Sequence, residues 1–434
     1  MLQFGTNSPQ SKFNNHHDTI VKNLEHFDSK CLHGAQVHAL MRLHEHFANI
    51  NSPNIALAVL PTGAGKSGVA VLAPFVLNSS RVLIITPSVL ISTQLYSDMC
   101  GPPANTFYVR RGLCSVEDLH KLSENGLLVD KTLIKGSTTM EEVVHRFKQH
   151  NLVIANAHKF GENTGFDLAK FPADIFDTVI VDEAHHYPAK TWKQIIDHFA
   201  TCKKVFLTAT PTHNGKQIVG NDLIDQNMNY TAFNLSREVA VSARIIRPLQ
   251  FIEVGNHHDD EEQRIRIVFD GMSRKLQEHD EQDPSFSHKA MIICYMVEEV
   301  DRVVEVINRC SNAELPLAVA YHGKSGKAGF ELFCNATSGN GRPARPQFLV
   351  SCGKALEGFD HPDISVVGIL RNIAPTSSVL FSQFVGRCVR IKGPDDRVTA
   401  TVVSHVFHSQ YDNYKKLDML AEHDPEDEAM VDLD

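Results

Sequence analysis

The chain has 434 residues, of which 42% are hydrophobic and 21% are charged. This composition is ordinary for a soluble globular protein and argues against a disordered chain, while the length predicts two domains of roughly 200 residues each. The formal net charge of −9 argues against broad, nonspecific attraction to phosphate backbones, although it leaves local basic grooves open.

The ends of the chain and the cysteines indicate its environment. Residues 1–18 contain no apolar stretch of signal-peptide length, and no segment approaches the roughly 18 apolar residues of a membrane span. Acidic residues dominate residues 422–434 and predict a solvated, disordered end. The 9 cysteines include no CxxC pair and no zinc-like spacing, which favours a reducing compartment. We therefore expect a soluble, intracellular protein that does not bind a membrane.

Short apolar runs alternate with longer amphipathic stretches along the chain. In the first half, we expect buried strands at residues 55–60, 82–86, 152–155, 178–181 and 205–208. The rhythm pauses near residues 244–263 and then resumes with expected strands at 291–295, 317–320, 348–350, 366–370 and 399–406. Continuous apolar runs of this length belong to parallel sheets that are covered by helices on both faces. We therefore predict two α/β domains joined near residues 235–250.

The first expected strand leads directly into a glycine-rich loop, PTGAGKS. Backbone N–H groups of such a loop point at phosphate oxygens, and the helix that begins near Lys66 adds its positive dipole end. Lys66 would contact the β- and γ-phosphates, and the hydroxyl of Ser67 would ligate Mg²⁺. The loop departs from the full P-loop consensus, because Leu60 occupies the first glycine position. The residues expected to contact the nucleotide are Pro61, Thr62, Gly63, Ala64, Gly65, Lys66 and Ser67.

The expected strand at residues 178–181 runs into an acidic pair, Asp182 and Glu183. Two carboxylates at the tip of a buried strand repel each other and are costly to desolvate unless a positive charge lies beside them. In a P-loop enzyme, an acidic residue at this position holds the Mg²⁺ shell, and Asp182 fits this role. Glu183 would then orient or deprotonate the attacking water. Mg²⁺ and Lys66 would balance the negative charge.

In chain order, six segments resemble the motifs of superfamily 2 helicases and translocases. They are PTGAGKS (61–67), TPSVLI (86–91), DEAH (182–185), TAT (208–210), ALEGFDHPD (355–363) and QFVGRCVR (383–390). The resemblance implies two RecA-like domains with ATP bound in the cleft between them. In style, LVSCGKALEGFD and SQFVGRCVR look most like the motors of type III restriction enzymes and excision-repair helicases, many of which act on DNA. Double-stranded-RNA sensors share much of this pattern, so DNA is favoured and RNA stays open.

The resemblance also implies roles for single residues. Gln36 would hydrogen-bond adenine, although His33 stands where the family usually has an arginine. Arg387 and Arg390 would reach the γ-phosphate, where a planar guanidinium suits charge that is spread over several oxygens. Gly358 and Asp360 would face the nucleotide from the second domain. The implied coupling residues are His185, Thr208, Thr210 and Gln383, and the implied nucleic-acid contacts are Thr86, Thr208 and Ser351. For the hydroxyls of these three contacts, an ordinary strand-end cap is an equal alternative.

These expectations define four segments. Residues 1–29 form an N-terminal extension, 30–240 and 241–415 form the two RecA-like domains, and 416–434 form the acidic tail. We expect an ATP- and Mg²⁺-dependent motor that moves on or remodels nucleic acid. Two alternatives stay open: a nucleic-acid-stimulated ATPase that remodels complexes without separating strands, and a nucleic-acid-binding scaffold without turnover. No nuclease motif is evident, so a nuclease partner would be on another chain.

Overall fold

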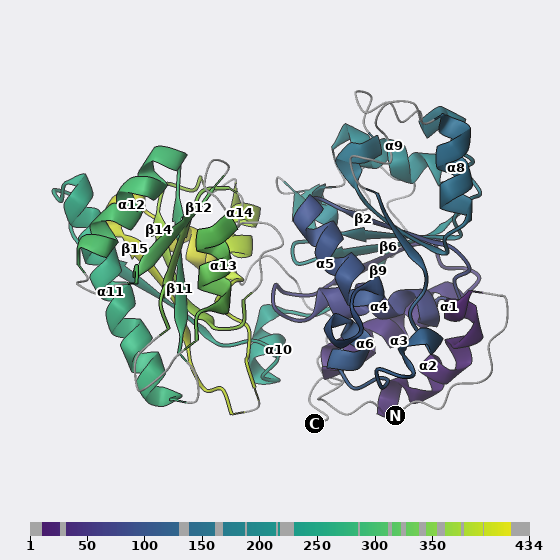
Figure 1. Cartoon of the computed structure of the whole chain (residues 1–434), viewed down its shortest axis with the longest axis horizontal. Coiled ribbons are helices and arrows are strands. Elements are labelled where there is room, and N and C mark those ends of the chain that lie inside the picture. The colour runs from purple at the N-terminus through teal and green to yellow at the C-terminus, as the bar shows by residue number, and fades with distance from the viewer. Residues whose placement is uncertain are drawn as a thin grey trace. The chain divides into compact units, whose positions relative to one another are not determined.

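The computed structural model describes residues 11–26, 32–129, 139–160, 168–186, 189–213, 216–217, 230–284, 287–310, 315–322, 327–337, 344–353, 361–374, 377–393 and 395–417. The described residues fall into two compact units, with the boundary between Val239 and Ala240 (Figure 1). In these ranges, no helix is long and apolar enough to cross a membrane. The acidic tail from residue 418 onwards lies outside the described residues.

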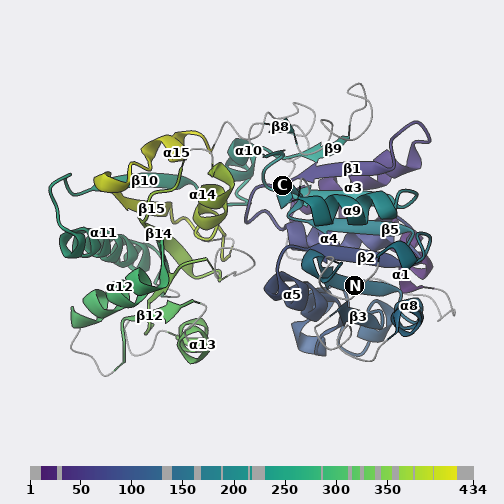
Figure 2. The same ribbon diagram turned by 90° about the horizontal axis from the view of Figure 1, so that it is seen from above.

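Unit 1 is built on a seven-stranded sheet in the order β3-β4-β2-β5-β6-β1-β9, in which every strand pair is parallel (Figure 2). Its strands are β1 (Ile55–Val59), β2 (Val82–Thr86), β3 (Gly126–Val129), β4 (Leu152–Asn156), β5 (Thr178–Asp182), β6 (Lys203–Thr208) and β9 (Thr231–Asn234). The five expected strands of the first half are confirmed. The edge strands β3 and β9 were not expected, because they are short and less completely buried.

Helices cover both faces of this sheet (Figure 1). The helices of unit 1 include α3 (Gly34–Ala48), α4 (Lys66–Val76), α5 (Val89–Cys100), α6 (Phe107–Arg110), α8 (Met140–Lys148) and α9 (Lys190–His198). On the face of α8 and α9, Phe147, Trp192 and Phe199 join one apolar core with alternate residues of the strands. The helices α3 and α4 lie on the other face. This burial of both faces explains why the strands read as continuous apolar runs.

The described part of the N-terminal segment packs on unit 1. Helix α1 (Lys12–Asn15) and helix α2 (His17–Asn23) lie against α4. Phe13 is fully buried, and its ring meets that of Phe75 edge-on at 5.0 Å. The ring nitrogen Nδ1 of His17 lies 2.7 Å from the carbonyl oxygen of Phe75. Residues 11–26 therefore stabilise the helix that follows the glycine-rich loop.

Unit 2 is built on a six-stranded parallel sheet in the order β10-β15-β14-β11-β13-β12. Its strands are β10 (Leu249–Val254), β11 (Lys289–Cys294), β12 (Ala318–Tyr321), β13 (Phe348–Ser351), β14 (Ile364–Leu370) and β15 (Ala400–His405). The five strands expected in this half are confirmed. Strand β10 lies inside the stretch where the sequence indicated only a pause. It was not predicted because it is a half-exposed edge strand that contains a charged residue. The prediction of two tandem RecA-like α/β units is confirmed.

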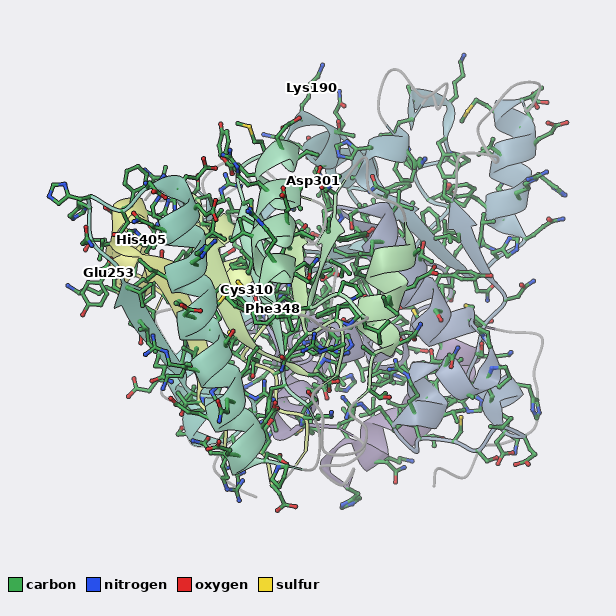
Figure 3. All side chains as sticks on the ribbon, turned by 60° about the vertical axis from the view of Figure 1, so that its left-hand side comes forward. Lys190, Glu253, Asp301, Cys310, Phe348 and His405 are labelled. Atoms are coloured by element: carbon green, nitrogen blue, oxygen red, sulfur yellow. The ribbon has the colours of Figure 1, made fainter. Side chains whose placement is uncertain are left out.

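The helices of unit 2 include α11 (Glu261–Gln282), α12 (Val297–Arg309), α13 (Lys327–Asn335), α14 (Ser378–Val385) and α15 (Tyr411–Lys415), and the boundary between the units falls within α10 (Arg237–Ser242). Helices α11 and α12 bury their apolar sides in one core with the sheet. Phe348 of β13, labelled in Figure 3, packs at 5.2 Å from the ring of Phe269 in α11. Asp260 begins α11 as an N-cap, where its carboxylate accepts from the backbone of Gln263.

Two neighbouring histidines give unit 2 a pH-dependent stability. His279 and His288 are 2% and 0% exposed, with their rings 5.4 Å apart. Burial, assisted by the charge of Arg247, lowers the pKa of His279 to about 4 and that of His288 to about 3. Each unit by which a pKa is lowered corresponds to about 1.4 kcal/mol. Because the unfolded chain binds protons more readily, this stability is present above pH 6.5 and is lost as the pH falls towards 4.

We predict that the urea midpoint for unfolding of unit 2 falls as the pH is lowered from 6.5 towards 4. The variant His279→Gln should flatten this fall, because glutamine keeps a polar group near the hydroxyl of Ser365, which lies 2.8 Å from Nδ1 of His279, but takes up no proton. Urea titrations of both proteins across the acidic range measure the effect. Equal slopes for the two proteins would contradict it.

Candidate nucleotide-binding site

The glycine-rich loop connects β1 to α4 with an open helix N-terminus. Gly63 and Gly65 have φ angles of 93° and 86°, which L-residues with side chains rarely adopt. A Cβ on Gly65 would lie 2.4 Å from Nε2 of Gln36, so a side chain at this position has no room. No side chain caps α4, so the N–H groups of its first turn are open to a ligand. Thr62 and Ser67 are half-buried, and Ala64 is fully buried.

Four side chains from three neighbouring strand ends form a continuous polar chain beside this loop. Nζ of Lys66 lies 3.8 Å from Oε1 of Glu183, and Oε2 of Glu183 lies 3.5 Å from Nδ1 of His185. Nδ1 of His185 lies 3.5 Å from the hydroxyl oxygen of Thr208. Strands β5, β6 and β1 are adjacent in the sheet, so their carboxyl ends meet at one edge. The fold thus brings together residues from three separate sequence motifs.

Thr208 and Thr210 form the end of this polar chain. The Thr208 hydroxyl donates to the carbonyl of Thr210 at 3.0 Å and accepts from the Thr210 N–H at 3.1 Å. His186, beside His185, stacks on the ring of Trp192 with centroids 5.9 Å apart. This contact of α9 with the DEAH segment was not expected from the sequence, which gives no spacing signal for it.

The two carboxylates at the end of β5 lie where negative charge is electrostatically unfavourable. Asp182 is only 6% exposed. Burial and the neighbouring Glu183 carboxylate raise the pKa of Asp182 to about 7, and Lys66 offsets this only in part. Glu183 also has a φ of 53°, a left-handed conformation that costs a residue with a side chain on the order of 1–3 kcal/mol. Strain and buried like charge at one position are typical of functional sites.

The residues present fit a magnesium ion. Asp182 supplies a buried carboxylate and Ser67 a half-buried hydroxyl at the start of α4. Mg²⁺ prefers oxygen ligands and usually combines one or two protein side chains with phosphates and water. Within the described ranges, no group of three or more His, Cys, Asp or Glu residues could hold a metal by itself.

Gln36 contacts the glycine-rich loop. It is 1% exposed, and its Nε2 donates to the carbonyl of Gly65 at 2.8 Å, while its Oε1 accepts from the N–H of His33 at 3.0 Å. Phe107 of α6 lies against Gly68 in α4 from the other direction. This contact packs α6 against α4 within unit 1. Adenine recognition by Gln36 stays a prediction.

The hydroxyls of Thr86 and Ser351 are turned into their units. Both residues are fully buried. The Thr86 hydroxyl lies 2.6 Å from that of Ser92 and donates to the carbonyl of Ser88 at 3.1 Å. The Ser351 hydroxyl donates to the carbonyl of Tyr321 at 2.8 Å. This geometry favours the strand-end cap, and nucleic-acid contact by these hydroxyls stays a prediction.

In unit 2, the segment QFVGRCVR forms the end of α14 and the turn that follows. Gln383 and Arg387 are each 8% exposed. Gly386 caps the carboxyl end of α14, and Arg390 forms an isolated antiparallel bridge with Ile246. The predicted nucleotide contacts Gly358 and Asp360 lie outside the described residues.

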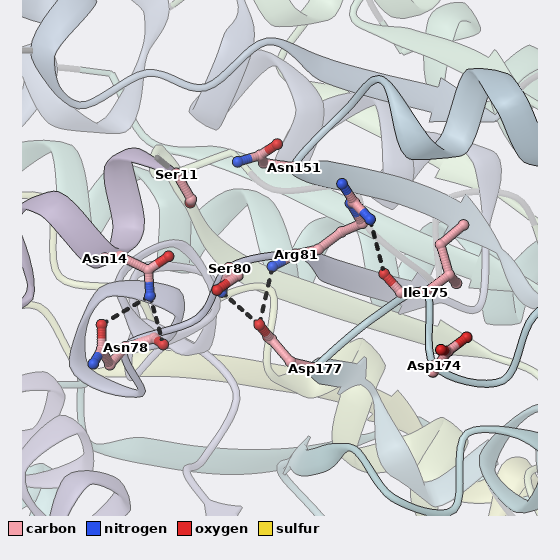
Figure 4. Close-up of a pocket in the computed structure, with 9 residues that line it drawn as sticks. All are labelled: Ser11, Asn14, Asn78, Ser80, Arg81, Asn151, Asp174, Ile175 and Asp177. Atoms are coloured by element: carbon pink, nitrogen blue, oxygen red, sulfur yellow. Dashed lines mark hydrogen bonds between the residues drawn. The ribbon is translucent and has the colours of Figure 1, made fainter. Parts of the chain in front are cut away.

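A cavity of about 780 Å³ lies elsewhere in unit 1. It is lined by loops that precede β2, β4 and β5, together with Ser11 and Asn14 of the N-terminal segment (Figure 4). Because Lys66 follows the carboxyl end of β1 in the same parallel sheet, the cavity lies at the opposite ends of the strands from Lys66. Asp177 accepts from the backbone N–H groups of Ser80 and Arg81 at 2.6 and 3.2 Å. Nη1 of Arg81 donates to the carbonyl of Ile175 at 3.4 Å. These contacts tie neighbouring loops together and account for the polar lining.

Comparison with known proteins identifies one family model. Residues 29–213 match the family model described as type III restriction enzyme, res subunit. No curated protein matches the chain.

Solved structures share the fold of both units. A fragment of a putative HsdR subunit of a type I restriction enzyme from Vibrio vulnificus YJ016 is 16% identical, with a TM-score of 0.58 over 94% of this chain and 73% of that one. The helicase Lhr of Mycobacterium smegmatis, bound to ssDNA and AMP-PNP, is 16% identical, with a TM-score of 0.58 over 95% of this chain and 50% of that one. Mss116p, bound to ssRNA and AMP-PNP, is 14% identical, with a TM-score of 0.57 over 95% of this chain and 78% of that one.

The family match covers the glycine-rich loop and the DEAH and TAT segments, and the structural matches extend over both units. Residues 29–213 are therefore similar to the type III restriction enzyme res subunit, and the two units share the tandem RecA-like fold of these solved structures.

Proposed function

We propose that the chain is an ATP-dependent nucleic-acid motor, a helicase or translocase that couples the hydrolysis of ATP to ADP and phosphate to movement on or remodelling of nucleic acid. The observation that carries this proposal is the contiguous chain from Lys66 through Glu183 and His185 to Thr208. Consecutive members of this chain lie 3.5–3.8 Å apart, and we assign them the roles of phosphate-binding lysine, general base, and coupling histidine and hydroxyl. A phosphoryl-transfer site needs this combination of positioning and charge compensation.

Each residue of the site has a defined task in this proposal. The backbone of residues 61–67 holds the phosphates, and Lys66 compensates their charge. Ser67 and Asp182 would hold Mg²⁺, which would supply positive charge to balance that of the phosphates. Glu183 orients the attacking water and accepts its proton. His185 and Thr208 couple the occupancy of the site to the rest of unit 1. Arg387 and Arg390 of unit 2 contribute positive charge at the γ-phosphate.

DNA is the favoured nucleic acid. The family match names a restriction enzyme subunit, and HsdR belongs to a restriction enzyme as well. Among the structural relatives, Lhr is bound to ssDNA but Mss116p is bound to ssRNA, so the fold accommodates either. If a nuclease acts together with this motor, we propose that it is a partner subunit on another chain.

ATP turnover tests the function most directly. We expect the purified chain to hydrolyse ATP in the presence of Mg²⁺ and to be stimulated more by DNA than by RNA. Turnover is measured without nucleic acid and with single- and double-stranded DNA and RNA of equal length. Stimulation by RNA alone would reverse the substrate assignment. Nucleic-acid binding without any turnover would establish the scaffold alternative.

The remodelling ATPase is the second candidate, because it uses the same site. A strand-displacement assay separates it from a helicase, since a remodeller hydrolyses ATP without releasing a labelled strand. The scaffold is disfavoured because Lys66, Asp182, Glu183 and Arg387 are all present, and the first three lie in one partly or fully buried cluster.

Replacing Glu183 by glutamine tests the assignment of the general base. Glutamine keeps the shape of the side chain but accepts no proton, so the chemical step should slow by about 10²–10⁴-fold. Nucleotide should stay bound, and the variant should hold nucleic acid in a long-lived complex. Turnover and the dissociation rate of labelled DNA, each measured with ATP, give the two readouts.

The matched control is Glu142→Gln, which changes an exposed carboxylate that caps α8 through the N–H of Thr139 at 3.1 Å. It should turn over like the wild type. If Glu183→Gln lost ATP affinity instead of turnover, Glu183 would be a structural or metal-holding residue and its proposed role would be wrong.

A further inference from the structure

Arg247 is a fully buried charged residue that the proposed reaction does not use. It is 1% exposed and precedes β10 at the start of unit 2. Its Nε and Nη2 donate to Oδ2 of Asp396 at 3.0 and 2.8 Å. Its Nη1 donates to the carbonyls of Ile364 at 2.9 Å and Cys388 at 3.0 Å. One guanidinium thus joins the start of β14, the turn after α14 and the loop before β15.

Asp396 is held as firmly as Arg247. Its Oδ2 also accepts from the N–H of Lys392 at 3.0 Å, and its Oδ1 accepts from the N–H of Val398 at 3.1 Å. Burial opposes the charge of Asp396, but the hydrogen bonds and charge of Arg247 keep the pKa of this carboxyl below its ordinary value. Both members of the pair are therefore charged and hydrogen-bonded on several sides.

The backbone of Arg247 contacts the same turn as its side chain. Its N–H donates to the carbonyl of Val389 at 2.6 Å, and Ile246 forms a bridge with Arg390. Cys388 and Val389 are the two residues that follow Arg387 and precede Arg390. The carbonyls of both are thus held by Arg247, one through its side chain and one through its backbone. Arg247 therefore contacts both residues of the turn between the two arginines.

We propose that Arg247, paired with Asp396, is a positioning residue that sets the orientation of Arg387 for ATP hydrolysis. This inference rests on the proposed function. A buried ion pair is weak support for stability, since apolar residues of similar volume often replace one at little cost. Its geometric effect is larger, because a displacement of about 1 Å at a catalytic group can cost about 10²-fold in rate.

Two variants test the positioning role. The double variant Arg247→Met with Asp396→Leu removes both charges together and fills the space, so that neither partner is left buried and unpaired. The variant Arg247→Lys keeps the positive charge but cannot reach Asp396 and both carbonyls at once. We expect both variants to fold and to bind ATP with near-normal affinity. We expect their nucleic-acid-stimulated kcat to fall by about 10²-fold without a matching rise in KM.

A second readout separates positioning from general weakening of unit 2. In an Arg387→Ala background, the Arg247 changes should cause little further loss of turnover, because the group that they position is already absent. The matched control is Asp259→Asn, which changes an acidic partner at the other end of β15, where Oδ2 of Asp259 lies 2.9 Å from Nε2 of His405 (labelled in Figure 3). This control should lower thermal stability at most and leave kcat unchanged.

The outcomes are distinct. Wild-type kcat in either folded Arg247 variant, or losses that multiply with that of Arg387→Ala, would overturn the inference. Loss of the fold in both variants would also overturn it and make the pair purely structural. If Arg387→Ala itself turned over normally, the proposed role of Arg387 would fail first. A large loss in Arg387→Ala with no loss in the Arg247 variants would refute the positioning role alone.

Discussion

Replacing Lys66 by alanine should abolish ATP hydrolysis and weaken nucleotide binding. Lys66 is 9% exposed at the start of α4, and its Nζ lies 3.8 Å from Oε1 of Glu183. A triphosphate bound in this loop would lose its main protein countercharge, and interactions of charges away from bulk water are only weakly screened. Turnover and the affinity for a fluorescent ATP analogue, measured on the same preparation, give the two effects.

A buried lysine elsewhere in unit 1 provides the control. Lys204 is 3% exposed at the opposite end of β6, where its Nζ donates to the carbonyl of Ala200 at 2.7 Å. Lys204→Met should keep ATP hydrolysis, because this lysine lies at the edge of the sheet away from the glycine-rich loop. Wild-type turnover in Lys66→Ala would exclude the glycine-rich loop as the phosphate site.

The sequence identified the central parts of the fold because their signals are local. A strand, a glycine-rich loop and a helix follow one another directly from Ile55 to Val76, so the geometry of the loop needs no distant contact. The apolar runs of β2, β5 and β6 are buried on both faces and therefore read as strands without alternation. The order of the motifs along the chain then predicted a second unit of the same type.

The edges of the sheets were less predictable. Strands β3, β9 and β10 each have one neighbour in their sheet and keep part of their surface exposed. Their sequences therefore carry fewer apolar residues, and TAFN at β9 looks like a loop. Tertiary context decides such strands, because β propensity depends on the partners against which a strand packs.

Sequence patterns did not predict which side chains contact residues that lie far away along the chain. Arg247 lies in the stretch where the succession of expected strands paused, yet it is buried against Asp396, 149 residues further along the chain. The Gln36 amide reaches the carbonyl of Gly65 across 29 residues, which composition cannot reveal. Thr86 and Ser351 were identified by motif position, but the direction of a hydroxyl depends on its neighbours. A sequence motif therefore predicts which residues gather at a site better than it predicts what each side chain contacts.

Replacing Arg387 by alanine should leave ATP binding to unit 1 nearly intact and remove most nucleic-acid-stimulated hydrolysis. In the proposed mechanism, the two units close on the nucleotide, and an arginine from unit 2 stabilises the charge that develops on the transferred phosphoryl group. An arginine in this role is worth on the order of 10³–10⁵ in rate. Its planar guanidinium suits the oxygens of that group, whereas a lysine would supply only a point charge. Stimulated turnover and ATP affinity are again measured on one preparation.

The competing explanation is that Arg387 only forms an ion pair at the surface of unit 2 and takes no part in hydrolysis. An exposed ion pair is worth about 0–1 kcal/mol and would leave turnover almost unchanged. Arg266 provides this comparison directly, because it is an exposed arginine of α11 whose Nη2 lies 2.6 Å from Oε1 of Glu262. Arg266→Ala should therefore behave like the wild type. Arg387 is only 8% exposed, and its turn is held by the buried Arg247, so its position is fixed far more firmly than a surface pair requires. Near-normal stimulated turnover in Arg387→Ala would mean that hydrolysis here does not depend on closure of the two units.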